Sequence, residues 1–343
     1  MPLSIGVQLT SRCNLNCRHC MIDGSAQDLP LNVLEKVISF AKACNVAFLA
    51  FSGGEPTLHG KFDEVVEMLA RNTLAFTMIT NGWNFTDWYR SMGPRMDTVR
   101  RLGFSLDGAT EEVHDLNRAD GSYRRVLQAA SICRYKGIPF GLRMTVTRRN
   151  IHQLEEMALL ASKIGAGEVA IIPLQPTPRT TALGIHLKPA DFRRINEESA
   201  RLRKIFKTTI SLTAGYFDSD PLVLCPPLSM RQIYVTSDGS LSFCCQLADF
   251  GGGLRGSELL GNLAEISVHE AYQRMVDAVA AFTNRKVRLL GDGKLGEMDH
   301  FSCWYCLKHF QKVNWMAEMT DDPWAKDLLG TSLCNPVRLA PAD

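Results

Sequence analysis

The chain has 343 residues, 45% of them hydrophobic and 22% charged, and a formal net charge of +2. This length suits a large domain plus a smaller one, and the composition excludes a disordered, collagen-like or coiled-coil protein. The near-neutral charge gives no general attraction to nucleic acid or to an anionic membrane. Neither a signal peptide nor an apolar run of about 20 residues that would span a bilayer is present, so we expect a cytoplasmic protein.

The first half of the chain alternates short apolar strands with helices, which predicts an α/β fold built on a parallel sheet. The expected strands are 5–9, 47–51, 75–80, 101–106, 140–146 and 169–174, and the helices between them include 31–44, 62–71, 123–135 and 151–164. Six units are fewer than the eight of a closed barrel. We therefore expect a partial (β/α)6 barrel with its site at the carboxyl ends of the strands.

The pattern changes after residue 174. An amphipathic helix over 192–206 is expected to form a bridge, with basic residues that Glu197 and Glu198 interrupt on a solvated face. Ser237-Asp238-Gly239 then separates two short strands, 232–235 and 241–243, and predicts a hairpin at the start of a small α+β domain. We expect a barrel over 1–185, a bridging helix and linker over 186–220, and a cysteine-bearing domain over 221–343.

Three of the eleven cysteines come directly after the first strand. Cys13, Cys17 and Cys20 have the spacing CX3CX2C. In a reducing cytosol such clustered thiols are more often metal ligands than disulfides. A zinc site needs four ligands, and His19 is the candidate for the fourth. A cubane iron-sulfur cluster held by three thiolates instead leaves one iron free for another molecule.

Further motifs follow the later strands, and with the cysteines they resemble the radical S-adenosylmethionine (SAM) superfamily. They are Gly53-Gly54-Glu55-Pro56, Thr80-Asn81-Gly82, Ser105-Leu106-Asp107-Gly108 and His114-Asp115-Leu116-Asn117-Arg118. The last two resemble the branch with an auxiliary SPASM or twitch cluster domain, which contains peptide maturases and radical epimerases or dehydrogenases. In that family a 4Fe-4S cluster reduces SAM to give methionine and a 5'-deoxyadenosyl radical, which removes a hydrogen atom from the substrate.

The resemblance implies which residues hold the cofactors. Cys13, Cys17 and Cys20 would bind the first 4Fe-4S cluster. Ser105 and Arg118 would contact the SAM carboxylate, since the guanidinium fork pairs with a carboxylate through two hydrogen bonds. The two glycines of the second motif would let the backbone approach the SAM amino group closely. The full set implied for SAM is His19, Gly53, Gly54, Glu55, Pro56, Asn81, Ser105, Arg118, Arg143 and Leu174, the last two for polar and adenine contacts.

A second group of cysteines lies in the last third of the chain and resembles the auxiliary-cluster domain of the same branch. Its members are Cys225, Cys244, Cys303 and Cys306. Lys312 and Met316 stand where the full SPASM form has further thiols, so the resemblance implies the shorter twitch form with one closed 4Fe-4S cluster that relays electrons. Four thiols by themselves equally permit a zinc ribbon, which the motifs of the barrel make the second choice.

Cys245 directly follows Cys244, and neighbouring side chains of an extended chain point in opposite directions. One of the two thiols is therefore expected to be free of the cluster. In radical epimerases that this chain resembles, such a cysteine gives a hydrogen atom to the substrate radical, and we assign this catalytic role to Cys245 as a hypothesis. A buried hydrophobic thiol is the simpler alternative, and we interpret Cys44, Cys133 and Cys334 in that way.

Three functions stay open at this point. The first is modification of a ribosomal peptide, by epimerisation through Cys245 or by crosslinking. The second is a radical dehydrogenation or epimerisation of a small molecule, such as an aminocyclitol or amino sugar. The third is a zinc-binding interaction protein without catalysis. His59, Gln175 and Tyr216 are candidates to line the mouth of the barrel, but the motifs do not identify the residue that meets the substrate.

The partners follow from the same resemblance. It implies a flavodoxin- or ferredoxin-type electron donor. Only twelve residues precede Cys13, so we expect no appended leader-peptide recognition domain. A separate leader-peptide-binding protein would then present a peptide substrate.

Overall fold

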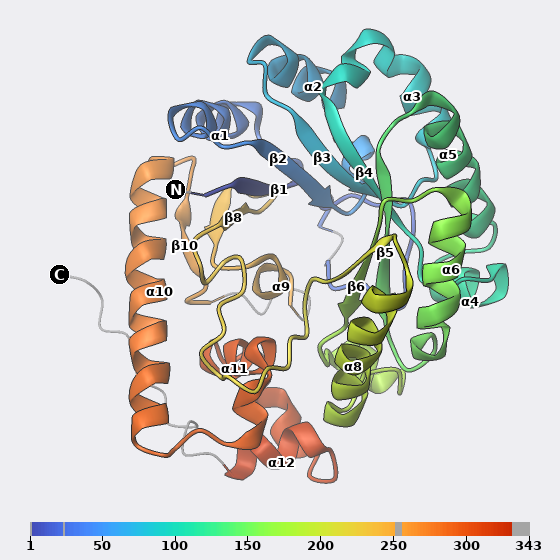
Figure 1. Ribbon diagram of the computed structural model, residues 1–343. Helices are drawn as coiled ribbons and strands as arrows, with labels where there is room; N and C mark the ends of the chain where they lie inside the picture. The colour runs from blue at the N-terminus through green and yellow to red at the C-terminus, as the bar shows by residue number, and fades with distance from the viewer. Residues whose placement is uncertain (1, 23–24, 251–255, 331–343) are drawn as a thin grey trace.

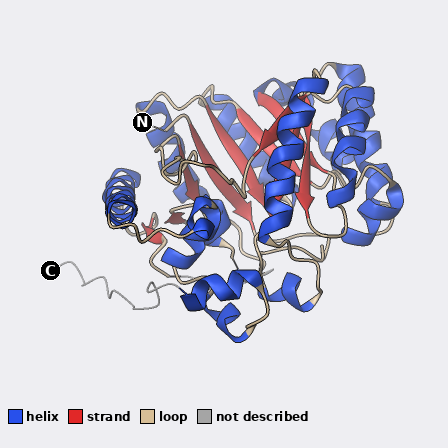
Figure 2. Ribbon diagram, turned by 60° about the horizontal axis from the view of Figure 1, so that its bottom comes forward, coloured by secondary structure: helices blue, strands red, loops and turns tan. Residues whose placement is uncertain are grey.

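The computed structural model describes residues 2–22, 25–250 and 256–330. They fold around one ten-stranded sheet with the strand order β10-β9-β8-β1-β2-β3-β4-β5-β6-β7. The central part of the sheet is strongly curved, and helices cover its outer face (Figure 1). In the view coloured by secondary structure, the strands lie together on the inside and the helices surround them (Figure 2).

The six expected strands form the centre of this sheet, each parallel to the next. They are β1 (Ser4–Thr10), β2 (Phe48–Gly53), β3 (Phe76–Thr80), β4 (Val99–Ser105), β5 (Phe140–Val146) and β6 (Glu168–Pro173). The helices between them are α1 (Leu31–Ala43), α2 (Phe62–Arg71), α3 (Phe85–Met92), α4 (Glu111–Asn117), α5 (Ser122–Lys136) and α6 (Leu154–Ile164). The α/β class and the partial barrel are confirmed, and α3 and α4 are additions to the expected helices.

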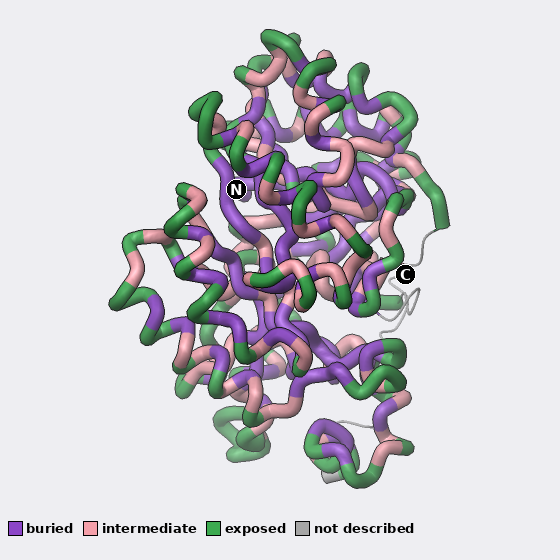
Figure 3. The backbone as a smooth tube through the Cα atoms, turned by 90° about the vertical axis from the view of Figure 1, so that its right-hand side faces the viewer, coloured by how far each residue is buried: buried purple, intermediate pink, exposed green. Residues whose placement is uncertain are grey.

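Alternation along the strands explains how the barrel is both packed and hollow. On β1, Ile5, Val7 and Leu9 are fully buried and belong to the hydrophobic core. Gly6 lies between them and faces the inside of the barrel, where it lines a cavity. Successive side chains of a strand point to opposite faces, so the helices seal one face while small residues leave space on the other. Buried segments accordingly run through the middle of the molecule, with exposed ones outside (Figure 3).

The chain after β6 continues the same sheet at both edges. After α7 (Pro178–Ala182) and α8 (Pro189–Ile205), β7 (Thr209–Leu212) pairs in parallel with β6. The expected hairpin is β8 (Gln232–Val235) and β9 (Ser240–Ser242), with Gly239 at φ +85° in its turn. β8 pairs in parallel with β1, and β10 (Leu259–Asn262) completes that edge. The cysteine-bearing part is thus attached to the first barrel strand, and the proposed division at residues 185 and 220 stays a prediction.

The remaining helices complete the fold. The cysteine-bearing part contains α9 (Cys245–Ala248), α10 (Val268–Gly291), α11 (Ser302–His309), α12 (Pro323–Gly330) and the short 3-10 helices Glu297–His300 and Asn314–Glu318, and the barrel contains the 3-10 helices Pro56–Leu58, Gly93–Thr98 and Ile151–Gln153. The rings of Trp304 on α11 and Trp324 on α12 lie 4.5 Å apart, and Trp324 also contacts Phe192 of α8 at 5.4 Å. This aromatic cluster fastens the end of the described chain to the bridging helix. Among the helices of the described ranges, none has the length and apolarity needed to cross a bilayer.

Lys312 stands at one of the two positions where the full SPASM form has a thiol, and here it forms a buried ion pair. It is 2% exposed, and its Nζ donates a hydrogen bond of 2.6 Å to Oε1 of Glu258, which is fully buried. A buried charge is tolerated when it is paired and hydrogen-bonded. The ion pair therefore ties the segment after α11 to the loop before β10.

Candidate functional site

A single cavity of about 450 Å³ joins the carboxyl ends of the barrel strands to the cysteine-bearing part of the chain. Its lining takes in the three-cysteine loop after β1, the ends of β2 to β6, and α9 with the residue that follows it. The predicted site residues among its lining are Cys13, Cys17, His19, Cys20, Gly53, Gly54, Asn81, Ser105, Arg118, Arg143, Leu174 and Cys245. Segments more than 200 residues apart in sequence therefore share one chamber.

Polar hydrogens point at the sulfurs of the three-cysteine loop. The backbone amide of Leu15 lies 3.5 Å from Sγ of Cys13, and the side-chain amide of Asn81 lies 3.9 Å from the same sulfur. Nη1 of Arg118 lies 3.8 Å from Sγ of Cys17. Burial raises the pKa of Cys17, and the Arg118 guanidinium acts against that rise. Such donors favour thiolates, which are the form that binds metal.

The glycine motif after β2 is held against the backbone of the three-cysteine loop. A Cβ on Gly53 would lie 2.3 Å from the carbonyl oxygen of Thr10, and one on Gly54 would lie 2.0 Å from that of Arg12. The amide of Gly54 donates to Thr10 O and that of Glu55 to Arg12 O, both at 2.8 Å. The glycines are thus required by this close packing, a reason for them that the sequence did not reveal. They also line the cavity.

Glu55 and Pro56 of the same motif do not line the cavity. The Glu55 carboxylate is 1% exposed and accepts hydrogen bonds of 2.8 Å from Thr57 Oγ1, Thr80 Oγ1 and the Asn81 amide. It therefore fastens the end of β2 to the end of β3. By binding the backbone amide of Asn81, Glu55 positions this residue at the cavity, where the side-chain amide of Asn81 reaches Sγ of Cys13.

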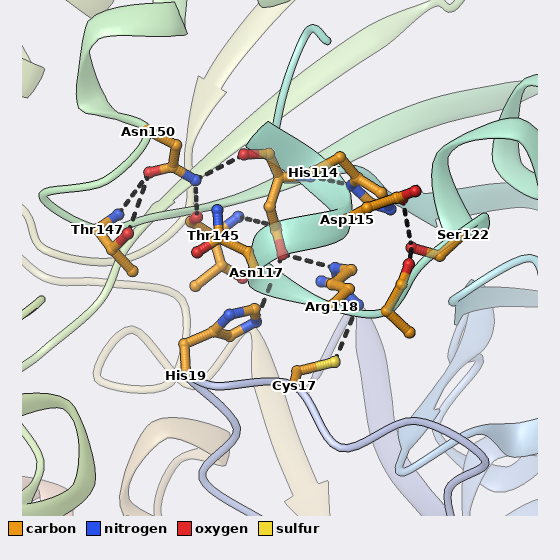
Figure 4. A network of polar contacts seen from close by, with 12 residues as sticks. Cys17, His19, His114, Asp115, Asn117, Arg118, Ser122, Thr145, Thr147 and Asn150 are labelled. Atoms are coloured by element: carbon orange, nitrogen blue, oxygen red, sulfur yellow. Dashed lines mark hydrogen bonds and ion pairs between the residues drawn. The ribbon is translucent and has the colours of Figure 1, made fainter. Parts of the chain in front are cut away.

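The carboxylate of Asp107 organises the opposite wall. It is fully buried; its Oδ2 accepts from Arg118 Nε at 2.5 Å and its Oδ1 from the Thr145 amide at 2.8 Å. Its backbone is fixed as well, since Asn150 Nδ2 donates to Asp107 O at 2.7 Å and the Asp107 amide donates to His114 Nδ1 at 2.9 Å. Figure 4 shows Arg118 held in this way with its other end turned toward Cys17. The structure thereby presets the direction of the Arg118 guanidinium beside the cysteine loop.

His19 completes this wall as a neutral ring. Burial lowers the pKa of His19 to about 4, although Asp107 lies 3.5 Å from its Nε2 and acts in the opposite direction. Nε2 faces the carboxylate, which assigns the hydrogen to that nitrogen. Nδ1 is buried and has no hydrogen-bond partner among the described residues. A buried acceptor of this kind, on a residue that lines the cavity, suits a bound molecule that brings a donor.

A second group of thiols surrounds a small apolar cavity beside the first. Cys225, Cys244, Cys303 and Cys306 line it together with Gln175 and Gln246. The amide of Gly215 donates to Cys303 Sγ at 3.3 Å, and that of Gln246 to Cys244 Sγ at 3.4 Å. Burial raises the pKa of Cys225 and of Cys303 to about 12. The structure therefore brings together the four cysteines that the sequence grouped, although 81 residues separate the first from the last.

The adjacent cysteines divide between the two cavities. Cys244 is the extended residue before α9 and lines the second cavity with the other three thiols. Cys245 is the first residue of α9 and lines the first cavity. Gln246 borders both. Residues 244–246 at the start of α9 thus form part of the wall between the two cavities.

The arrangement of the thiols distinguishes two kinds of metal site. Within the described ranges, no three cysteine, histidine, aspartate or glutamate side chains converge on a point where one metal ion could bind. A zinc ion requires such convergence, because its four ligands all lie within about 2.3 Å of it. A cluster of several irons is wider and takes thiolates that stand apart around it. Neither group of cysteines, as the described residues place them, converges in the way that a single ion requires.

The other expected residues have varied positions. His59 lines neither cavity, because its ring bridges the Leu29 carbonyl oxygen at 3.0 Å and the Lys61 amide at 3.1 Å. Tyr216 lies near the second group of thiols, which together with burial raise its pKa. Cys133 is fully buried on α5. Cys334 lies outside the described residues.

Several residues of the first cavity were not singled out from the sequence. Tyr234 on β8 lies over Gly6, and its hydroxyl is 3.1 Å from Ser52 Oγ. Asp249 accepts from Gln8 Nε2 at 3.2 Å through each of its oxygens. The helical spacing of Cys245 and Asp249, four residues apart, was the one signal that could have placed them on a common face.

Comparisons with known proteins show what this chain is similar to. Residues 7–161 match the model of the radical SAM superfamily. The mycofactocin maturase MftC of Mycobacterium tuberculosis is 32% identical over 194 residues, which are 55% of this chain and 49% of MftC. The AdoMet-dependent heme synthase of Methanosarcina barkeri is 30% identical over 224 residues, 62% of each chain. The chain thus spans about half the length of the first relative and less than two thirds of the second.

The fold has solved counterparts. The structure of SuiB from Streptococcus suis bound to the precursor peptide SuiA superposes with a TM-score of 0.62 and 14% identity, covering 79% of this chain and 64% of SuiB. At that identity the likeness is one of fold. It agrees with the parallel sheet and the partial barrel described above.

Proposed function

We propose that this chain, which contains a radical SAM domain over residues 7–161, cleaves SAM reductively and modifies a peptide by first removing one of its hydrogen atoms. One observation carries the proposal. The three-cysteine loop, the residues implied for SAM and Cys245 all line the same cavity. A reactive species formed at the loop would therefore be enclosed with whatever substrate fills the rest of that chamber.

The residues present fit the two groups that the family implies. Cys13, Cys17 and Cys20 would hold a 4Fe-4S cluster, with amide and guanidinium hydrogens already directed at two of the sulfurs. Ser105 and Arg118 would meet the carboxylate of SAM beside that cluster. The unpartnered Nδ1 of His19 offers an acceptor in the same wall.

The chemistry then divides between the bound groups and the protein. When bound, the cluster supplies an electron to SAM, which breaks into methionine and a 5'-deoxyadenosyl radical that abstracts hydrogen from the substrate. The protein's own residues bind, aim and insulate. Asp107 fixes the direction of Arg118, the apolar side chains of Ile79 and Leu174 line the cavity at the ends of β3 and β6, and Cys245 faces the cavity from the other side.

A peptide is the proposed substrate for two reasons. The relative MftC is a maturase, and the fold is one that accommodates a precursor peptide in SuiB. A flavodoxin- or ferredoxin-type donor and a separate leader-peptide-binding protein complete the proposal. A small-molecule substrate is the second candidate, because the heme synthase matches a larger share of both chains than MftC does.

The test is anaerobic reconstitution with iron, sulfide, SAM and reductant, followed by addition of a peptide whose α-carbons carry deuterium. The expected result is 5'-deoxyadenosine that contains one deuterium when the peptide is the substrate. Unlabelled 5'-deoxyadenosine whose amount rises only with a small molecule would favour the second candidate. Absence of 5'-deoxyadenosine with every substrate and reductant would contradict both.

The second group of thiols is proposed to hold one auxiliary 4Fe-4S cluster that relays an electron. Substituting Cys303 with alanine should lower the iron content from about eight to about four atoms per chain, because each such cluster carries four irons. Iron and zinc quantitation on the same samples is the measurement. Stoichiometric zinc in the unmodified protein, lost in Cys303→Ala, would contradict an iron-sulfur relay at this site.

Cys245 is proposed to return a hydrogen atom to the substrate radical, which would make the modification an epimerisation. This leaves a thiyl radical on Cys245, and one electron from the proposed flavodoxin- or ferredoxin-type donor, relayed through the second group of thiols, together with one proton would restore the thiol. With a peptide that is turned over, Cys245→Ala should still form 5'-deoxyadenosine while the product with the inverted centre disappears. Chiral amino-acid analysis of the hydrolysed peptide measures this, and Cys44→Ala, at the end of α1 and away from the cavity, is the control. An inverted product from Cys245→Ala would exclude the donor role and favour crosslinking.

A further inference from the structure

The first cavity continues through the barrel, toward the amino ends of the strands. Its lining there includes Gly6 on β1, Ala50 on β2 and Gly103 on β4. In the sheet register Gly6 is paired with Ala50, Ala50 with Thr77 and Thr77 with Arg101. Small residues on the inner face of a barrel leave room for a ligand. Arg101 lies at the far end of that room.

Arg143 is directed to the same end. It is paired with Ser105 in the sheet, yet its side chain runs back along the inside of the barrel. Its Nε would lie 3.1 Å from a Cβ on Gly103, so the guanidinium passes over that glycine, and its Nη1 lies 2.8 Å from Oε2 of Glu168. Glu168 is the first residue of β6. The guanidinium therefore points away from the carboxyl ends of the strands, where the cysteine loop lies.

Glu168 is shared between the two arginines. Nη1 of Arg101 lies 3.2 Å from the same oxygen, Oε2, that Arg143 contacts, and Oε1 accepts from Ser211 Oγ at 2.7 Å. Burial would raise the pKa of Glu168, but Arg143 and Ser211 lower it below the ordinary range. One carboxylate thus faces two guanidinium groups. The far end of the cavity carries a net charge of +1.

The two arginines also have N–H groups that make no hydrogen bond within the described residues. Among the described residues, Arg101 donates one hydrogen bond, to Glu168, and its side chain is 50% exposed. A guanidinium has five N–H donors in a planar fork that matches a carboxylate. We propose that Arg101 and Arg143 form a subsite for a carboxylate of the substrate, so that the substrate of the proposed reaction is an acid. This inference rests on the proposed function in taking the first cavity as the substrate chamber.

The charge count favours a carboxylate over a phosphate. A carboxylate carries one negative charge, which neutralises the excess charge beside Glu168. A phosphate monoester carries about −1.5 to −2 at neutral pH, which would leave the subsite with a net negative charge. An acidic side chain or the C-terminus of a peptide, or a free organic acid, supplies the favoured group.

The test measures binding without turnover. The SAM-loaded holoenzyme, without reductant, is titrated with N-acetyl-glutamate N-methylamide, its glutamine counterpart, propionate and inorganic phosphate. Saturation-transfer NMR reports the dissociation constants of the first three. Phosphate has no carbon-bound hydrogen, so its binding is measured by competition with the glutamate probe. The glutamate probe should bind in about the millimolar range, and the glutamine probe about tenfold more weakly, as expected for one charge-assisted contact. Propionate binding as well as the glutamate probe would assign the subsite to free acids and not to peptides.

The variant Arg101→Gln should raise the dissociation constant of the glutamate probe about tenfold. It leaves Glu168 bound to Arg143 and Ser211, so the barrel should keep its stability. Arg71→Gln is the matched control, because Arg71 is exposed and paired with Glu67 on α2 outside the barrel. Each of four results would overturn the proposed subsite. They are equal binding of the probe by Arg101→Gln and the unmodified protein, equal binding of the two amino-acid probes, no binding of any probe, and binding of phosphate that is tighter than that of the glutamate probe. Since no SAM cleavage is involved, a chain that makes no 5'-deoxyadenosine would contradict the proposed function alone.

Discussion

Replacement of Cys17 by alanine is expected to empty the first site of iron and to abolish 5'-deoxyadenosine formation. Cys17 is 7% exposed, lines the first cavity and receives the guanidinium of Arg118 at 3.8 Å. Without it only Cys13 and Cys20 remain in the loop, and two thiolates are fewer than a cubane cluster needs. Iron should fall from about eight to about four atoms per chain, with the remaining half at the second group of cysteines.

Cys133→Ala is the matched control. This thiol is fully buried in the hydrophobic core on α5 and lines neither of the two cavities, so it is no candidate metal ligand. The variant should keep all its iron and lose only about 1 kcal/mol of stability, as is common for a small core truncation. Iron and sulfide quantitation with the spectrum of the reduced protein compares the two. Full iron in Cys17→Ala would remove the basis for a three-cysteine cluster site.

The architecture of the barrel was accessible from the sequence because each of its units is local. The strands 5–9 and 140–146 are apolar runs that end where a polar motif begins, and the structure places β1 and β5 over nearly the same residues. Parallel strands end at one edge of a sheet, so motifs that follow successive strands must meet there. That is why ten expected residues from the ends of five strands, β1, β2, β3, β4 and β6, line one cavity.

The contacts that fix the site were not accessible in the same way. Asp107 lies in a motif that reads as a turn, and its partners Arg118 and Thr145 are 11 and 38 residues away. From the sequence, Lys312 only marks a position where a SPASM thiol is lacking, and its ion-pair partner Glu258 is 54 residues away. No spacing rule relates such pairs. The direction of Arg143 was inaccessible for a similar reason, since it depends on Gly103 and Glu168 of the neighbouring strands.

Removal of the Asp107 carboxylate is the second substitution with a large expected effect. Asp107→Asn leaves a guanidinium whose side chain is only 9% exposed without its negative partner. Breaking one member of a buried ion pair costs about 3 to 5 kcal/mol, so the free energy of unfolding should fall by that amount. Urea denaturation of the cluster-free protein measures it. Glu112→Gln is the control, because the Glu112 carboxylate is exposed on α4. Its free energy of unfolding should stay within about 0.5 kcal/mol of that of the unmodified protein.

Stability and SAM binding should separate in the double variant. Asp107→Asn with Arg118→Met removes both charges, and an uncharged replacement of a buried ion pair is often neutral or stabilising. Most of the lost stability should therefore return, while the affinity for SAM stays at least about tenfold below that of the unmodified protein, because no guanidinium is left to meet the SAM carboxylate. Equilibrium dialysis with the reconstituted protein measures that affinity. If the double variant bound SAM normally, Asp107 and Arg118 would be a structural pair, and the carboxylate would have to be held by Ser105 or by the backbone at the end of β2.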